Sequence, residues 1–207
     1  MIEITSDEKP ARARARWLAG CFLFIAAAQY LLAILISESI YTGYSVRQNF
    51  ESDLGNWSLD GNNAAVYNVS SVLLGGFMIG SAYYLQRSTR YRRLPILLAV
   101  AGASILITGV FSEDISSIAE GFFSFIAFIA IISCAVRSHK FVKSSFAYVL
   151  VFFGAMSLVA LILFVLGQFD AVFFLGIGRG GMEGLAVYPL ILWVLGYSAF
   201  LMGESAK

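Results

Sequence analysis

Six apolar stretches dominate this sequence, and each is long enough to cross a membrane as a helix. A bilayer core is about 30 Å thick, and about 20 apolar residues span it in helical form. Hydrophobic residues make up 59% of the chain and charged residues only 13%, whereas an average soluble domain carries about a quarter charged residues. The stretches cover residues 17–37, 64–85, 94–111, 118–136, 145–167 and 185–203.

These stretches predict an all-α fold. They lack the alternation of apolar and polar residues that membrane β-barrel strands need. The longest polar segment, residues 38–63, is too short to enclose a hydrophobic core of its own. We therefore predict a polytopic membrane protein with a single transmembrane domain over residues 1–207, a bundle of six helices whose first helix stays as a membrane anchor.

The distribution of basic residues predicts the orientation of the bundle. Lysine and arginine favour short cytoplasmic loops, because they resist translocation. With the N-terminus inside, only Arg47 and Arg179 of the 14 basic residues fall outside. We therefore predict a multi-pass protein of the cell membrane with both termini in the cytoplasm. The basic residues on that side are Lys9, Arg12, Arg14, Arg16, Arg87, Arg90, Arg92, Arg93, Arg137, Lys140, Lys143 and Lys207.

Few residues in this chain suit metal or covalent chemistry. The single histidine, His139, lies in a basic inner loop, and Cys21 and Cys134 fall in apolar stretches, so neither a haem framework nor a structural disulfide is expected. The sequence contains no nucleophile elbow, zinc motif or phosphate-binding glycine loop. We predict no metal site and no nucleic-acid partner. The sequence assigns no cofactor and no catalytic residue, so whether the chain is an enzyme stays open.

Polar residues at the outer ends of the helices predict one shared pocket. Acidic side chains at the ends of apolar helices are expensive to desolvate singly, so we expect them to group around water, a cation or an arginine. Such grouping requires the first outer loop to fold inward over the bundle. The residues predicted to form the pocket are Asp53, Asn68, Glu113, Asp114, Glu120, Arg179 and Glu183.

Several of these residues also have a purely structural interpretation. Asn68 suits a hydrogen bond between helices. Ser117 and Glu120 have the spacing of a capping box at the start of a helix. Arg179 precedes Glu183 by about one helical turn and suits an ion pair with it. The sequence leaves both interpretations open at each position.

Glycines in the second stretch predict a close helix contact. Gly76 and Gly80 are four residues apart, a spacing that lets another helix approach closely. We expect both glycines to face a neighbouring helix.

The chain resembles a family of prokaryotic membrane proteins, the domain of unknown function nine hundred and ninety-eight family, over nearly its whole length. The resemblance implies six helices and no established reaction. Where it leads us to expect a histidine this chain has Glu120, and where it leads us to expect an arginine it has Gly184. The segments that carry it are Tyr44-Ser45-Val46, Ser52-Asp53-Leu54-Gly55, Tyr67-Asn68-Val69-Ser70, Gly109-Val110-Phe111-Ser112-Glu113-Asp114, Phe123-Ser124-Phe125, Gly180-Gly181-Met182-Glu183, Tyr188-Pro189 and Trp193.

Three functions fit these observations. The first is binding of a lipid or small amphipathic molecule in the polar pocket at the outer leaflet, with membrane lipids as partners. The second is transport of a small molecule or an ion, which the scarcity of ionisable residues at mid-membrane depth disfavours. The third is an accessory role in a membrane complex, in which other membrane subunits or a second copy of the chain are the partners.

Overall fold

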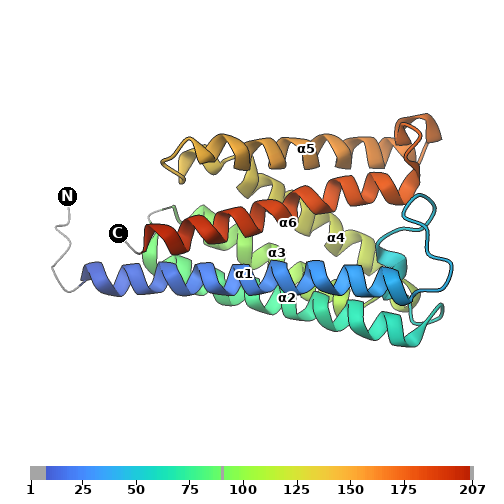
Figure 1. Ribbon diagram of the computed structural model, residues 1–207, viewed down its shortest axis with the longest axis horizontal. Helices are drawn as coiled ribbons and strands as arrows, with labels where there is room; N and C mark the ends of the chain where they lie inside the picture. The colour runs from blue at the N-terminus through green and yellow to red at the C-terminus, as the bar shows by residue number, and fades with distance from the viewer. Residues whose placement is uncertain (1–7, 90, 206–207) are drawn as a thin grey trace.

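The computed structural model describes residues 8–89 and 91–205, and all the regular secondary structure within them is helical (Figure 1). All six long helices are apolar and long enough to cross a membrane. The all-α, six-helix prediction is confirmed, and the fold is that of a multi-pass membrane protein. The long helices are α1 (Glu8–Ile40), α2 (Gly61–Ser88), α3 (Arg93–Val110), α4 (Glu113–Ala135), α5 (Phe146–Gly167) and α6 (Gly178–Glu204), and the short 3-10 helices are η1 (Ser52–Gly55), η2 (Ser138–Lys140) and η3 (Ala171–Phe174).

α1, α2 and α6 extend at both ends beyond the apolar stretches that predicted them. α1 begins at Glu8 and α6 at Gly178, so the basic segment before the first stretch and the glycine-rich segment before the sixth are both helical. α2 begins at Gly61, because the side chain of Asp60 accepts hydrogen bonds from the first free backbone N–H groups of the helix. Hydropathy marks the part of a helix that suits the bilayer, whereas capping residues decide where the helix begins.

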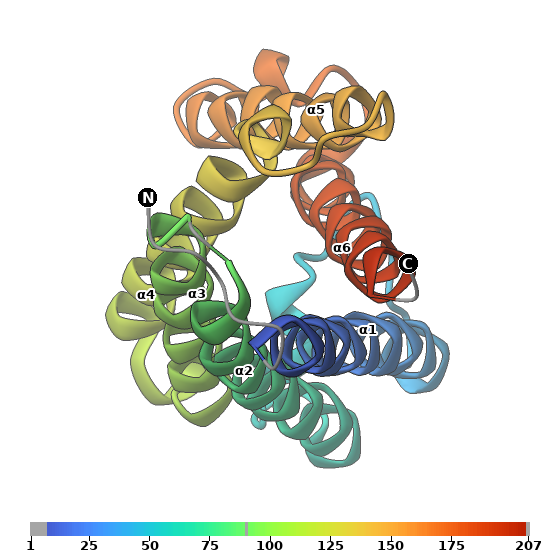
Figure 2. The same ribbon diagram turned by 90° about the vertical axis from the view of Figure 1, so that its left-hand side faces the viewer.

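The six helices form a ring (Figure 2). α1 packs against both α2 and α6, α2 packs against α3, and α5 packs against α6. α4 contacts α3 extensively but makes fewer contacts with α5 and few with α6. The seam between α4 and α5 is therefore the loosest between consecutive helices, and the interior of the ring is the space in which a ligand site can form. α1 begins and α6 ends at the same end of the ring, and we call the opposite end, with residues 41–60 and 168–177, the loop end (Figure 1).

Glycines of α2 allow close contacts with neighbouring helices, but only one of the two predicted glycines does so. A Cβ atom on Gly80 would lie 2.7 Å from the ring of Phe22 in α1, so the prediction for Gly80 is confirmed. A Cβ on Gly76 would meet nothing within 4 Å, so the prediction for Gly76 is wrong. Gly75 takes its place, because it packs directly against the backbone of Gly102 in α3. Adjacent residues of a helix point about 100° apart, and the spacing of two glycines does not indicate which face meets a neighbour.

The loop between α1 and α2 folds inward over the ring, as the pocket prediction required. Leu54 in η1 is fully buried. Asn63 Nδ2 donates to the Leu54 carbonyl at 3.0 Å, and Asn68 Nδ2 donates to the Gly55 carbonyl at 2.8 Å. On the far side of the ring, Gly180 in the first turn of α6 lies so close to the loop backbone that a Cβ there would overlap the carbonyl of Asn49. The loop is therefore wedged between α2 and α6.

Candidate functional site

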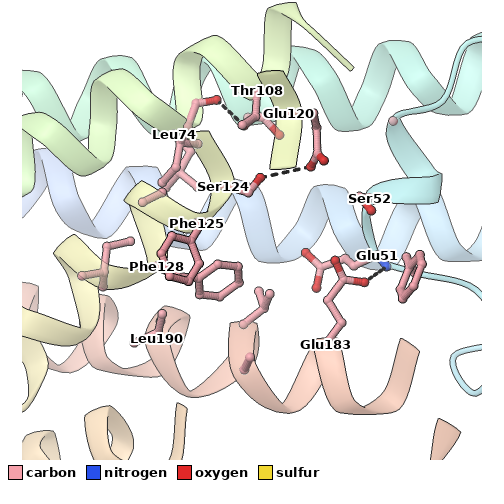
Figure 3. Close-up of a pocket in the computed structure, with 18 of the residues that line it drawn as sticks. Glu51, Ser52, Leu74, Thr108, Glu120, Ser124, Phe125, Phe128, Glu183 and Leu190 are labelled. Atoms are coloured by element: carbon pink, nitrogen blue, oxygen red, sulfur yellow. Dashed lines mark hydrogen bonds between the residues drawn. The ribbon is translucent and has the colours of Figure 1, made fainter. Parts of the chain in front are cut away.

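A pocket of about 370 Å³ occupies the interior of the ring at the loop end, and all six helices and the inward loop line it. We call it the glutamate pocket, because Glu51, Glu113, Glu120 and Glu183 are among its lining residues. Its volume lies within the range of small-molecule sites, which is about 300–1,000 Å³. Figure 3 shows the carboxyl groups of Glu51 and Glu183 beside each other, with Glu120 opposite on α4.

The structure brings together four of the seven residues predicted for this site. Asn68, Glu113, Glu120 and Glu183 line the pocket, although they come from three different helices. Asp53, Asp114 and Arg179 do not line it. Four of the predicted residues therefore line one cavity, and the other polar residues around it differ from those predicted.

The residues outside the pocket have local structural partners. Asp53 Oδ2 accepts from the backbone N–H of Phe50 at 2.9 Å, which shapes the turn leading into η1. Asp114 accepts a hydrogen bond from Ser112 Oγ at 2.7 Å at the start of α4. Arg179 Nε donates to the carbonyl of Gln48, and its guanidinium carbon lies 4.5 Å from the centre of the Phe50 ring.

The position of Arg179 overturns its predicted role. Arg179 is exposed and holds the outside of the loop, so it does not pair with Glu183. Its charge acts on Glu113 at the edge of the pocket and not on the buried glutamates. Glu183 instead accepts a hydrogen bond from the backbone N–H of Glu51 at 2.5 Å. Residues one turn apart on a helix can meet, but the loop offers each of these side chains a different partner.

Glu51 is the acidic residue that sequence reasoning missed. Its side chain is 4% exposed, and its Oε1 atom accepts from the hydroxyl of Tyr30 at 3.2 Å. The other oxygen, Oε2, is buried without a hydrogen-bond partner among the described residues. Burial raises the pKa of Glu51 to about 8; the Tyr30 hydrogen bond lowers the pKa, and the charge of Glu38 raises it further. A loop position alone gives no signal of such burial.

Two tyrosines connect Glu51 to the second helix. Tyr30 Oη donates to Glu51, lies 2.9 Å from Tyr67 Oη, and the two rings pack with centroids 5.9 Å apart. Both tyrosines line the pocket. In sequence they read as ordinary aromatic residues near the ends of membrane helices. Their pairing depends on the contact between α1 and α2, which the sequence does not give.

Glu120 lines the pocket, and the helix that carries it is capped by a serine other than Ser117. α4 is broken at Ser116, which has φ −160° and ψ 90°, and Ser116 Oγ accepts from the backbone N–H of Ala119 at 3.3 Å. The predicted capping box of Ser117 and Glu120 is therefore wrong. Glu120 is left without a capping role, and its Oε1 accepts from Ser124 Oγ one turn further along the helix at 3.0 Å.

The charge of the pocket is unbalanced. None of the described residues that line it is lysine, arginine or histidine. The described residues also contain no group of three or more histidine, cysteine, aspartate or glutamate side chains that could hold a metal ion. Hard cations such as Ca²⁺ take six to eight oxygen ligands at one point. The carboxyl groups are thus dispersed around a cavity and do not converge on one point.

Away from the glutamates the pocket becomes apolar. Its deeper walls include Leu74, Met78, Ile131, Ile191 and Val194. Val194 lies about three turns beyond Glu183 on α6, a rise of roughly 16 Å at 1.5 Å per residue. This distance is about half the thickness of the hydrocarbon core. The pocket is therefore amphipathic along the axis of the bundle.

One wall of the pocket is also part of the outer surface of the bundle. Phe125 of α4 and Val165 of α5 both line the pocket, and they are 51% and 42% exposed. They lie on either side of the loosest seam between consecutive helices.

Fold and site together define a multi-pass helical membrane protein with a buried carboxyl-lined pocket. The chain belongs to the family described as Protein of unknown function (DUF998), whose model matches residues 24–200. This match confirms the family expected from the sequence. Searches of curated proteins and of solved structures found no match to the chain.

Proposed function

We propose that this protein binds a lipid or other small amphipathic molecule in the glutamate pocket. The polar group lies at Glu51, Glu120 and Glu183, and the apolar part extends along the deeper walls toward Val194. The observation that carries the proposal is the amphipathic character of the cavity, polar at the loop end and apolar toward the middle of the bundle. A water-soluble ligand would leave the apolar half of the cavity without a partner.

The charge distribution in the sequence supports a position for the pocket at the outer leaflet. In that orientation both termini lie in the cytoplasm and the loop end faces outward. The exposed wall at Phe125 and Val165 then opens to the outer half of the bilayer. A membrane lipid can enter there without passing through water.

The proposal is tested by filling the apolar half of the pocket. Leu190 of α6 lines the pocket and is 5% exposed, whereas Leu192 on the same helix is 45% exposed and does not line it. We expect Leu190→Trp to reduce the lipid that the protein retains from nanodiscs, as measured by native mass spectrometry, by at least fivefold. Leu192→Trp makes the same change in size outside the pocket and should retain as much as the unmodified protein. Equal retention in both variants would remove the pocket as the binding site.

The two alternative functions predict different results. A transporter moves its substrate across the bilayer, so proteoliposomes should show uptake that Leu190→Trp abolishes. An accessory subunit should instead be retained with a partner during mild purification, whether or not the pocket is filled. Binding without transport, and without a retained partner, is the result expected from the proposal.

A further inference from the structure

We propose that the polar group recognised in the glutamate pocket is a protonated amine, so that the ligand class is a cationic amphiphile. This inference rests on the proposed function and specifies its ligand. Two observations carry it. The pocket is lined by four glutamates with no basic side chain among its described lining residues, and the buried Oε2 atom of Glu51 has no hydrogen-bond partner in the part of the chain that the structure describes.

The hydrogen bonds around Glu51 leave one acceptor for a ligand. Its backbone N–H donates a hydrogen bond to the carboxyl group of Glu183, and its Oε1 atom accepts one from the hydroxyl of Tyr30. Oε2 remains, and a buried acceptor without a partner is unfavourable. An ammonium group has three N–H donors and no acceptor, so it complements a set of carboxylate oxygens.

Other ligand chemistries fit these residues less well. A divalent metal ion needs several oxygens at one point, and the described residues contain no such group. A hydroxyl group can donate to Oε2, but it brings no positive charge to a pocket lined by four glutamates with no basic side chain among its described lining residues. An acidic headgroup would add a further negative charge beside Glu51, Glu120 and Glu183. A cation with N–H donors satisfies both the charge and the hydrogen bond.

The headgroup rather than the chain must supply selectivity. A ligand that comes from the bilayer leaves an apolar solvent and enters an apolar wall, so its chain gains little from the transfer. The carboxyl groups are the feature of the pocket that the bilayer does not offer. Discrimination between lipids is therefore expected to follow the charge of the headgroup.

The test compares three probes with the same twelve-carbon chain: dodecylamine, dodecanol and dodecanoate. Binding is measured by calorimetry on the full-length protein in a non-ionic detergent at pH 7, where a primary amine is protonated. We expect dodecylamine to bind at least tenfold more tightly than either of the other probes. Equal affinity of the three probes, with all binding blocked by Leu190→Trp, would overturn the amine inference and leave the proposed function intact. No binding of any probe would remove both.

Matched variants locate the effect. Glu51→Gln keeps the shape of the side chain and removes its charge, and it should weaken dodecylamine binding at least tenfold while leaving dodecanol unchanged. Asp170→Asn is the control, because Asp170 is exposed at the loop end and does not line the pocket. Glu120→Gln is a second pocket variant outside the loop, and it should also weaken dodecylamine binding if Glu51→Gln fails to fold. Unchanged dodecylamine affinity in folded Glu51→Gln and Glu120→Gln would refute the inference.

A proton balance gives an independent readout. Because burial raises the pKa of Glu51 to about 8, Glu51 holds a proton at pH 7 when the pocket is empty, and an ammonium group displaces it. Dodecylamine binding should therefore release a proton, tighten as the pH rises toward 8, and lose this dependence in Glu51→Gln. A pH-independent affinity in the unmodified protein would contradict this. The titratable groups coupled by charge to Glu51 are Tyr30 and Glu38 of α1, Tyr67 of α2, Glu183 and Tyr188 of α6 and Tyr44 of its own loop, and Glu113 and Glu120 of α4 line the same pocket.

Two further probes distinguish the source of the amine. Phosphatidylethanolamine carries an ammonium headgroup on a membrane lipid, whereas phosphatidylcholine has a cation without N–H donors. Spermidine carries amines without an apolar chain. Selective retention of phosphatidylethanolamine from mixed nanodiscs supports a membrane-lipid source, and tight spermidine binding supports a free amine. The inference would be overturned if phosphatidylethanolamine were not selectively retained, spermidine did not bind tightly and dodecylamine bound only weakly.

Discussion

The burial of Glu51 predicts that the stability of the protein falls as the pH rises. The pKa of Glu51 in the folded protein is about 8, against an ordinary value of 4.5. Between these values the folded protein holds a proton that the unfolded chain has released. The contribution of Glu51 to the free energy of unfolding therefore decreases from pH 4.5 to about pH 8 and then levels off. At 1.36 kcal/mol per pH unit, the full difference is about 5 kcal/mol.

Glu51→Gln removes this dependence, because glutamine does not ionise. We expect the variant and the unmodified protein to have similar stability at pH 4.5, and the variant to be more stable at pH 8.5. For a chain of this size 1 kcal/mol corresponds to about 2–4 °C in Tm, so the difference at pH 8.5 is on the order of 10 °C. The assay is thermal unfolding in detergent, followed by tryptophan fluorescence at several pH values.

The comparison uses differences between variants, which cancel the pH dependence of the detergent and of other residues. Asp170→Asn, which removes one carboxylate charge outside the pocket, should not reproduce the effect. A constant difference in Tm between Glu51→Gln and the unmodified protein from pH 4.5 to pH 8.5 would refute the reasoning. It would mean that the carboxyl group is solvated or already compensated in the folded protein.

Three further predictions concern packing, the loop and orientation. Gly75→Leu should lower the free energy of unfolding by about 3 kcal/mol or more through overpacking against α3, whereas Gly76→Leu should leave thermal stability unchanged; equal effects would contradict the packing. Asn68→Ala should cost about 1–3 kcal/mol, because it leaves the carbonyl of the inward loop unpaired, and thermal unfolding measures this. In intact cells a cysteine at exposed Ser58 should react with an impermeant reagent and one at exposed Ser144 should not, in a background without the two native cysteines; the opposite result would reverse the orientation.

The sequence predicted some features of the site. The cost of isolated acids at the ends of apolar helices predicted that polar residues would gather, and Asn68, Glu120 and Glu183 do line one cavity. The same argument did not identify Arg179 as a residue of the outer surface, because a cation near the membrane boundary can turn toward the pocket or toward the loop. The carbonyl of Gln48 and the ring of Phe50 decided between them.

The local cap of α4 shows the limit of motif reading. Ser116 and Ser117 are adjacent, and both precede a helical segment by a suitable spacing. α4 is broken at Ser116, which is the cap, and Glu120 lines the pocket without a capping role. A shift of one residue changes the direction of a helical side chain by about 100°, so a motif that is right to within one residue can still assign the wrong face.

The sequence by itself determined the class of protein, because crossing a bilayer requires a continuous apolar stretch and satisfied backbone hydrogen bonds, both of which are local properties. It thereby determined the six helices and their order. Only the tertiary structure decided that Glu51, from a loop, meets Tyr30 of α1 and Glu183 of α6 inside the ring. These residues are far apart in the chain, and their contact depends on how the helices pack and on where the loop is held. The chemistry of the pocket arises from that convergence, which no single segment of the chain encodes.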